Sequence, residues 1–541
     1  MNEFVAEAAT KTNFTPIDWC IVVAYLLVSL AIGLVVKRFA TSMSAYIAAG
    51  RNVGVWLGVA SMTGTELGLI TVMYSAEKGF KGGFAAFHIA VLAGMVTFVI
   101  GVTGFIVAPL RETGVLTIPE YYGRRYGNRT RILGGIILAG GGILNMGLFL
   151  KVGSMFIVGV TGLSQQGWAM PVVMTTLLAL VLVYTVLGGM ISVIVTDYIQ
   201  FVVLAFGLLL ATWLAVAKLG WDNIFTTVES TMGAGGFNPF VSEGHFGVEY
   251  VLWMAFLGIV GCALWPTAVA RALAMESTEA VKRGFRWSSI SFTIRFLIPY
   301  FWGICALVFF VHHEPQLAAA FGIGGESSPN GEPPANALYA MPLFIGRLLP
   351  AGVIGIVSAA MIAAFMSTHD SYLLCWSSVI VQDVIAPLSQ KRLDTKTRVL
   401  LTRISIVAIG VYIWAWGLFY KGRDDIWDYM AITGAIYFTG AFALLAGGLY
   451  WKRASSTGAF CALIAGCSAV IGLAPIRDPV AGVVLAALGR EASPAAVAEF
   501  LTSARVGLGT ICFTLVVFVV VSLLFPDAAK QEDSEATEGA T

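Results

Sequence analysis

The chain of 541 residues is 58 % hydrophobic and only 12 % charged, and its formal net charge is +1 at pH 7. Soluble domains carry about 25 % charged residues, so a soluble protein of this length would lack the charge to cover its surface. The composition predicts an all-α membrane protein whose outer surface contacts lipid. The near-zero net charge gives no sign of a nucleic-acid partner.

Residues 1–17 are polar and are expected to lie outside the membrane rather than to form a signal peptide. A membrane-crossing helix needs about 20 mostly apolar residues. A transmembrane domain is predicted over residues 18–525, with about thirteen crossing helices. The predicted spans are 18–37, 53–77, 83–109, 131–160, 168–187, 190–217, 248–270, 286–312, 350–385, 398–420, 425–449, 455–475 and 504–525.

Basic residues concentrate in alternate loops of this arrangement. Loops rich in Lys and Arg stay on the cytoplasmic side, which places the N-terminus outside and the C-terminus inside a plasma (inner) membrane. Residues 526–541 are acidic and poor in bulky apolar side chains, and they are expected to form a disordered cytoplasmic tail. The more basic set of loops contains Lys37, Arg38, Arg51, Arg111, Arg124, Arg125, Arg129, Arg131, Arg271, Lys282, Arg283, Arg286, Lys391, Arg392, Lys396, Arg398, Lys452 and Arg453.

Two of the predicted spans contain residues that interrupt helices. The second span has the run SMTGTELGLIT, and the seventh has LGIVGCALWPT with Gly258, Gly261 and Pro266. Broken helices at corresponding places in two halves of a chain indicate a transporter binding site. Spans two and seven are five apart, which predicts inverted repeats over about 53–217 and 248–449. The alternative is that these glycines only permit close helix packing.

The ninth span carries a polar stripe in the run VSAAMIAAFMSTHDSYLL. Ala364, Ser367, Thr368 and Ser371 follow i, i+3, i+4, i+7 spacing and share one helix face. Two adjacent hydroxyl groups are neutral hard-oxygen ligands of the kind a sodium ion prefers. The alternative is that the hydroxyls bond to carbonyl groups of their own helix.

Ionisable residues inside predicted spans are the other candidates, because a charge inside the bilayer is costly. Each of these residues either takes part in the function or pairs with another group of the protein in a purely structural contact. For Lys151 there is a third possibility, because its long side chain can extend to the membrane interface. The candidates are Glu66, His88, Lys151, Asp197, Arg295, His369 and Asp370.

Six stretches in order resemble the sodium:solute symporter family, which includes bacterial proline and sialic acid carriers and the sodium–glucose cotransporters. They are AYIAAGRNVGVW, TIPEYYGRRYGNRTR, YTVLGGMISVIVTDYIQ, RALAMESTEAVKRG, AAFMSTHDSYLL followed by Asp383, and GGLYWKRASSTGAF. The resemblance covers about residues 18–475. It implies five-plus-five inverted repeats with one leading helix and two trailing helices.

The resemblance also implies cation sites. The common sodium site carries over to the hydroxyl groups of Ser367 and Thr368 and the carbonyl of Ala364. The opposing carbonyl groups fall at Ala60 and Thr63 in the second span. A second site, for sodium or a proton, falls at Asp197, Asp370 and Ser371.

For the solute, the resemblance directs attention to four positions. Sugar carriers of the family have Gln where Leu67 falls, Asn where Trp265 falls and Lys where Arg295 falls. Loss of the two polar contacts argues against a sugar, and an arginine fork suits a carboxylate. Glu66 is the internal partner for Arg295. The expected solute is a small carboxylate or zwitterion.

The predicted function is sodium-coupled uptake of a small organic solute by alternating access. Sodium, the solute and membrane lipid are the expected partners, and no cofactor is expected besides the coupling ion. A transport-like membrane sensor and a proton-coupled carrier of the same fold are the alternatives. The sequence has no metal-ligand cluster, nucleophile–base motif or phosphate loop, so it is not expected to be an enzyme.

Overall fold

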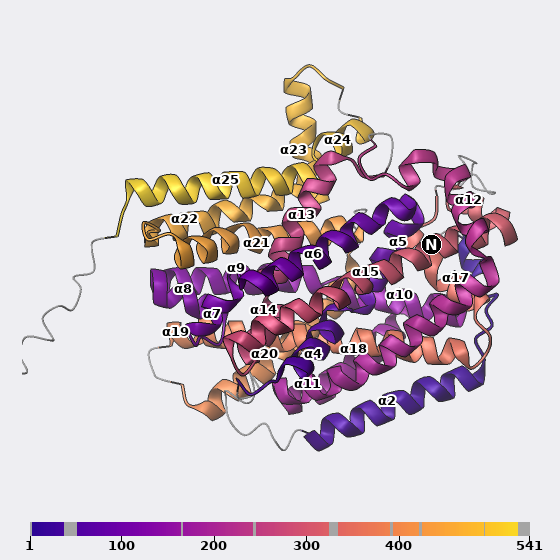
Figure 1. Ribbon diagram of the computed structural model, residues 1–541, viewed down its shortest axis with the longest axis horizontal. Helices are drawn as coiled ribbons and strands as arrows, with labels where there is room; N and C mark the ends of the chain where they lie inside the picture. Colours follow the sequence, from indigo (N-terminus) through magenta and orange to yellow (C-terminus); the bar gives the residue numbers. More distant parts are fainter. Residues whose placement is uncertain are drawn as a thin grey trace, which may run out of the picture.

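The computed structural model describes residues 3–36, 51–163, 166–241, 245–323, 334–389, 393–420, 425–491 and 493–527. In this part of the chain the long elements are all α-helices, most of them running along the long axis of the molecule (Figure 1). The main helices are α1 (Glu3–Ala8), α2 (Pro16–Val36), α4 (Val55–Glu66), α5 (Leu69–Gly82), α6 (Phe87–Thr103), α7 (Val107–Glu112), α8 (Ile118–Tyr126), α9 (Asn128–Met146), α10 (Phe149–Thr161), α11 (Ala169–Leu219), α12 (Trp221–Met232), α13 (Val248–Ala263), α14 (Pro266–Ala274), α15 (Thr278–His313), α16 (Pro315–Ala320), α17 (Ala340–Leu348), α18 (Val353–Val379), α19 (Ala386–Leu388), α20 (Thr395–Phe419), α21 (Ile426–Tyr450), α22 (Ser456–Gly466), α23 (Ala474–Ala487), α24 (Pro494–Phe500) and α25 (Ser503–Leu524).

Within these described ranges, nine helices are long and apolar enough to cross a membrane, or up to ten if one bent pair counts as a single span. The bent pair is Ser456–Gly472 with Ala474–Ala487, at 84°. The prediction of a many-span helical membrane protein is confirmed, but the count is lower than thirteen. Breaks shorten some predicted spans, and the helix Leu69–Thr103 joins parts of two of them.

Helix α11 contains two predicted spans, 168–187 and 190–217, in 51 residues. That much helix rises about 75 Å, more than twice the hydrocarbon thickness of a bilayer, about 30 Å. Its two ends nevertheless lie at the same end of the molecule. Thr12 donates a hydrogen bond to the carbonyl of Val160, just before α11, and Asn13 donates to Leu349. Lys218, near the end of α11, donates to Leu348. The segment before α11 and the last turn of α11 therefore both lie beside Leu348 and Leu349.

The second and seventh predicted spans are broken, as their sequences predict. Helix α4 stops at Glu66 and α5 starts at Leu69, while α13 stops at Ala263 and α14 starts at Pro266. The far ends of α4 and α14 are also tied together, because the backbone of Val53 bonds to Ala274 and Glu276.

Helix α18 forms the centre of the core. Its side chains are almost all buried from Ile354 to Val379, and it packs against α2, α11 and α20. The helix continues without a break into a π-helical turn at Ile380–Ile385. Such turns occur mostly at functional sites.

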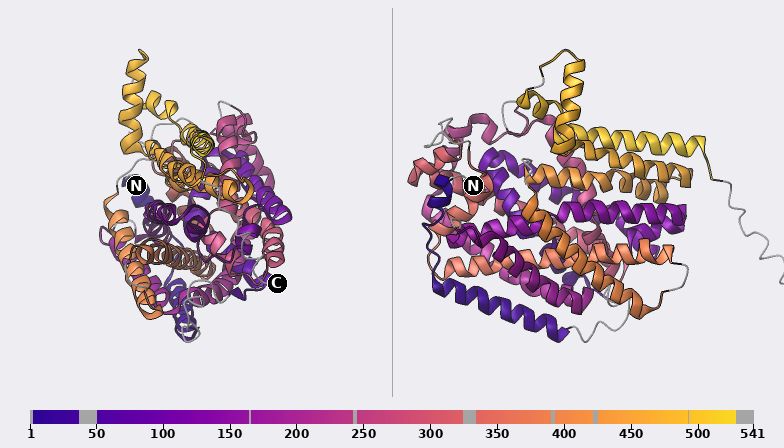
Figure 2. Two further views of the ribbon diagram at one scale, coloured as in Figure 1. Left: turned by 90° about the vertical axis from the view of Figure 1, so that its left-hand side faces the viewer. Right: turned by 180° about the vertical axis from the view of Figure 1, so that it is seen from behind.

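The segment 476–503 is largely helical. Helices α23 and α24 pack on each other through Ala481, Leu485 and Val497, and they project from the bundle (Figure 2). The chain starts at one end of the bundle, and α25 finishes at the other (Figure 1). The acidic tail lies outside the described residues from position 528 onward.

Candidate functional site

The two helix breaks face each other in the middle of the bundle. At the first break, Leu67 leaves the helix with φ −93° and ψ 64°, and Gly68 is extended. At the second, Trp265 is extended with φ −62° and ψ 122°, and Pro266 starts the next helix. The hydroxyl of Thr267 donates a 2.6 Å hydrogen bond to Oε1 of Glu66, which joins the two breaks.

A buried cavity of about 130 Å³ adjoins both breaks. Of the four predicted solute residues, Glu66, Trp265 and Arg295 line this cavity; Leu67 does not, and its side chain is only 5 % exposed. Glu66 and Arg295 are the two charged residues among the lining residues of the described chain. The cavity therefore carries one negative and one positive charge in an otherwise apolar and aromatic wall.

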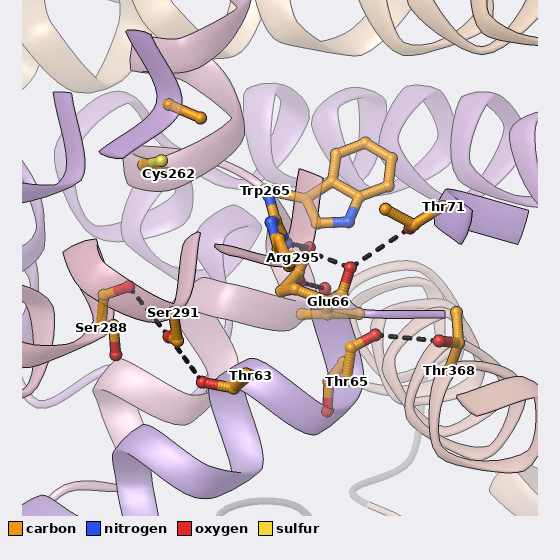
Figure 3. Close-up of polar contacts among 12 residues, drawn as sticks. Thr63, Thr65, Glu66, Thr71, Cys262, Trp265, Ser288, Ser291, Arg295 and Thr368 are labelled. Carbon is orange, nitrogen blue, oxygen red and sulfur yellow. Dashed lines mark hydrogen bonds and ion pairs between the residues drawn. The ribbon is translucent and has the colours of Figure 1, made fainter. Parts of the chain in front are cut away.

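Arg295 on α15 uses one side of its guanidinium to hold the first break. Its Nη1 atom lies 3.1 Å from the carbonyl oxygen of Glu66 and 3.4 Å from Oε2 of the same residue (Figure 3). The guanidinium carbon lies 3.8 Å from the ring centroid of Phe292 and 4.6 Å from that of Phe296. The buried Nε atom has no hydrogen-bond partner in the described structure. One donor of the guanidinium therefore has no protein partner among the described residues.

Two aromatic pairs line the cavity. The rings of Tyr74 and Trp427 have centroids 4.5 Å apart. The indole nitrogen of Trp265 donates a 2.6 Å hydrogen bond to the hydroxyl of Tyr372. All four residues line the cavity, so aromatic side chains form a large part of its wall.

Asn145 on α9 is a lining residue that the sequence reasoning missed. Its amide nitrogen donates to the carbonyl of Met430 and the hydroxyl of Thr433, both at 2.9 Å. Its buried Oδ1 has no partner among the described residues. A buried amide in the run GGGILNMGLFL was a usable signal, because polar groups inside a membrane span require a reason.

The hydroxyl pair of α18 lies against the end of α4. Ser367 donates to the carbonyl of Gly64 at 2.8 Å and to that of Ala364 at 3.1 Å, and Thr368 donates to Thr65 at 2.9 Å. Three of the predicted sodium residues therefore lie together beside the unwound backbone.

The other two predicted sodium residues lie further back on α4. The hydroxyl of Thr63 donates to the carbonyl of Val59 and to Ser291 at 2.7 Å (Figure 3), and Ala60 is buried. The carbonyl groups that accept from the α18 hydroxyls are thus Gly64 and Thr65, rather than Ala60 and Thr63.

Asp197 and Ser371, predicted for a second cation, meet around a residue that the sequence reasoning assigned to a loop. Arg271 on α14 is 1 % exposed, and its Nη2 lies 3.2 Å from Oδ2 of Asp197 and donates to Ser371. Ser61 and Thr65 also donate to Oδ2 of Asp197, at 2.8 and 3.0 Å.

Asp370 adjoins this cluster, since Ser371 donates to its Oδ1 at 3.1 Å. Asp370 and Asp197 are both fully buried. The cluster therefore contains two carboxylates and one guanidinium. Oδ1 of Asp197 has no partner among the described residues.

The remaining ionisable candidates make local structural contacts. His88 and His369 each bond to a carbonyl oxygen of their own helical segment, at Ala85 and Phe365. Lys151 donates to the carbonyl of Tyr420 at 2.8 Å. None of these three residues lines the central cavity.

Comparison with known proteins identifies the family of this chain. The model of the family described as "Sodium:solute symporter family" matches residues 46–466. A sodium/glucose cotransporter of Vibrio parahaemolyticus is 24 % identical over 479 residues, covering 83 % of each chain. A sodium/sialic acid symporter of Proteus mirabilis is 24 % identical over 485 residues, covering 85 % of this chain and 90 % of the relative.

The fold matches a solved structure as well. The substrate-bound, outward-open structure of a sodium-coupled sialic acid symporter aligns with a TM-score of 0.73 at 20 % identity, over 95 % of this chain and 99 % of that one. The long helices, the paired breaks and the match over residues 46–466 lead to one conclusion. The chain belongs to the sodium:solute symporter family and is a multi-pass membrane transport protein, not an enzyme.

Proposed function

We propose that the protein couples sodium entry to uptake of a small zwitterionic solute. The observation that carries this proposal is the charge of the central cavity. Its two charged lining residues, Glu66 and Arg295, have opposite signs and lie in contact. A net-charged solute would leave one charge unbalanced in a buried cavity, which is costly, whereas a zwitterion keeps the sum at zero.

The solute's two charged groups would each find a partner at the first helix break. A carboxylate binds the edge of Arg295 that includes Nε, because Nη1 is already used by Glu66. An ammonium group binds Glu66, whose Oε1 now accepts from Thr267. Trp265 supplies an apolar wall, which suits a compact solute better than a polyhydroxylated one. The described contacts support no solute role for Leu67 beyond packing beside the break.

Sodium would bind between α18 and the end of α4. The proposed ligands are the hydroxyl groups of Ser367 and Thr368, the carbonyl of Ala364, and carbonyl groups of the broken helix. For the last group, the resemblance implies Ala60 and Thr63, while Gly64 and Thr65 are the carbonyl groups nearest to the hydroxyls. All of these oxygen atoms are neutral and hard, as sodium requires.

A second cation or a proton remains the proposal for Asp197, Asp370 and Ser371. Arg271 pairs with Asp197, and Asp370 adjoins this pair through Ser371, so the cluster gathers two carboxylates around one position. Two buried carboxylates close together do not both stay ionised without cations. Sodium at this place gives a stoichiometry above one, and a proton gives pH-dependent transport.

Two breaks that meet at one cavity support transport by alternating access. In the inverted-repeat arrangement, rocking of one repeat against the other exposes the cavity to each side in turn. Such a movement would separate the two residue pairs Tyr74–Trp427 and Trp265–Tyr372. The basic loops support an orientation with the N-terminus outside.

The test is uptake into proteoliposomes with a panel of labelled zwitterions, monocarboxylates, amines and sugars, each with and without an inward sodium gradient. Sodium-dependent accumulation of a zwitterion is the expected result. Accumulation of sugars alone would contradict the charge argument. Accumulation driven by a proton gradient but not by sodium would favour the proton-coupled alternative.

A further inference from the structure

A groove of about 850 Å³ opens at the end of the bundle where α25 finishes. It lies between α8, the start of α22 and the end of α25, which meet at this end in Figure 1 and in the opposite view of Figure 2. Four basic residues line it, Arg124 and Arg125 from α8 and Lys452 and Arg453 from the connection before α22. Asp527 is the one acidic lining residue of the described chain.

Two of the four cations are held in position, and two are available. Arg124 pairs with Glu120 at 2.6 Å, and Arg125 donates to the carbonyl of Ala454 at 2.9 Å. Lys452 and Arg453 are exposed and make no ion pair within the described residues. The groove therefore has an excess of positive charge that the described residues do not balance.

The carboxylate of Asp527 marks the place where an anion fits. It accepts from the backbone nitrogen of Ser456 at 2.9 and 3.1 Å and from the hydroxyl of Ser456 at 3.0 Å. Ser456 is the first residue of α22. The free N–H groups and the dipole of a helix N-terminus attract anions, and here a carboxylate of the chain is bound to them.

An apolar track leads along α25 into the same groove. Val516, Val519, Val520 and Leu523 follow i, i+3, i+4, i+7 spacing on one helix face. Their side chains are 59 %, 41 %, 46 % and 51 % exposed. Leu523 also lines the groove. In a membrane this face contacts lipid chains, so the basic groove lies where the headgroup of such a lipid would be.

We propose that this groove binds the headgroup of an anionic phospholipid, with an acyl chain against the Val516–Leu523 face of α25. The phosphate would be bound by Lys452 and Arg453, with Arg125 beside them. Basic pockets between transmembrane helices are suited to this chemistry. A free phosphate would use the charges but not the apolar track. The carboxylate of Asp527 occupies the N-terminus of α22 and competes there with the lipid phosphate, so it weakens lipid binding.

Native mass spectrometry of the delipidated full chain tests this proposal by titration with phosphatidylglycerol or with phosphatidylcholine of the same acyl chains. The wild type is expected to retain phosphatidylglycerol preferentially. Lys452→Gln with Arg453→Gln should weaken that binding roughly 30-fold, if each cation contributes about the usual amount near an anionic lipid. Asp527→Asn should strengthen it.

The matched control is Lys282→Gln with Arg283→Gln, which removes the same charge at the start of α15, outside the groove. This control should bind phosphatidylglycerol as the wild type does. Equal loss in both double variants would mean nonspecific attraction and would overturn the proposal. So would equal binding of the two lipids. If preference appears only in a chain ending at Asp527, the acidic tail is the natural occupant and the lipid proposal is wrong.

Discussion

Nη1 of Arg295 contacts two oxygen atoms of one residue, the carbonyl oxygen and Oε2 of Glu66, at 3.1 and 3.4 Å. Because Glu66 is the last residue of α4, this contact fixes the charge of the cavity at the point where the helix unwinds. A ligand that competes for either partner therefore acts directly on the break.

Arg295→Lys keeps the charge but loses the planar fork. Loss of one charge-assisted hydrogen bond, about 1.5–3 kcal/mol, should raise the half-saturating solute concentration roughly 10- to 100-fold. Arg295→Gln should nearly abolish uptake. Arg505→Gln, which removes an exposed arginine paired with Glu249, is the control. Normal folding by size-exclusion chromatography with unchanged solute affinity in Arg295→Gln would rule out the carboxylate contact.

Ser367→Ala and Thr368→Ala should each raise the sodium concentration needed for half-maximal uptake, with little change in protein abundance. Each variant removes one ligand oxygen from a buried site. Thr368→Ser should retain most of the sodium affinity, because it keeps the hydroxyl. Ser377→Ala is the control, since Ser377 lies on the same helix and bonds only within it, to Leu374. Wild-type sodium dependence in both alanine variants would show that the ion binds elsewhere.

Gly68→Ala should impair sodium-dependent uptake although its backbone conformation suits any residue. A Cβ atom at position 68 would overlap Oγ1 of Thr368 and lie 3.0 Å from its Cβ. The added methyl group therefore displaces the hydroxyl. Gly140→Ala, where nothing lies within 4 Å, should transport normally and is the matched control. Equal activity of the two variants would mean that Thr368 tolerates displacement.

Asp197 and Arg271 should show strong coupling in a double-mutant cycle. Arg271→Gln leaves the buried carboxylate of Asp197 without its cation, which should cost about 3–5 kcal/mol of stability. Asp197→Asn combined with Arg271→Gln should recover much of this loss. Thermal unfolding of the detergent-extracted proteins measures both effects. Additive losses in the double variant would indicate that the two residues act independently.

Glu535→Cys should react with a membrane-impermeant thiol reagent only from the cytoplasmic side, and Lys11→Cys only from the outside. The alternation of basic loops is the reason for this orientation. The experiment needs replacement of the seven native cysteines. Labelling of position 535 from outside would reverse the orientation.

Features that depend on local sequence were predictable. Pro266 cannot continue a helix from the preceding turn, and the Gly-rich run before Leu69 weakens α4, so both breaks could be located. The spacing of Ala364, Ser367 and Thr368 places them on one face of any helix. Their contact with the first break then follows from the resemblance.

Features that depend on tertiary structure were not predictable. Arg271 counts as a loop charge by its position, and only folding brings it to Asp197, 74 residues away along the chain. Which carbonyl groups of α4 face the hydroxyl pair, those of Gly64 and Thr65, depends on where α4 unwinds. The aromatic residues of the cavity wall were also missed. The sequence of an apolar span does not show whether an aromatic side chain contacts lipid or a cavity.

Three consecutive residues, Gly64, Thr65 and Glu66, contact the hydroxyl pair on one side and the cavity charge on the other. If sodium and solute bind at the two sites proposed above, communication between them requires no relay through the protein. Thermodynamic reciprocity then sets a strict condition. The factor by which sodium tightens solute binding must equal the factor by which solute tightens sodium binding, and any change at this tripeptide alters both factors together.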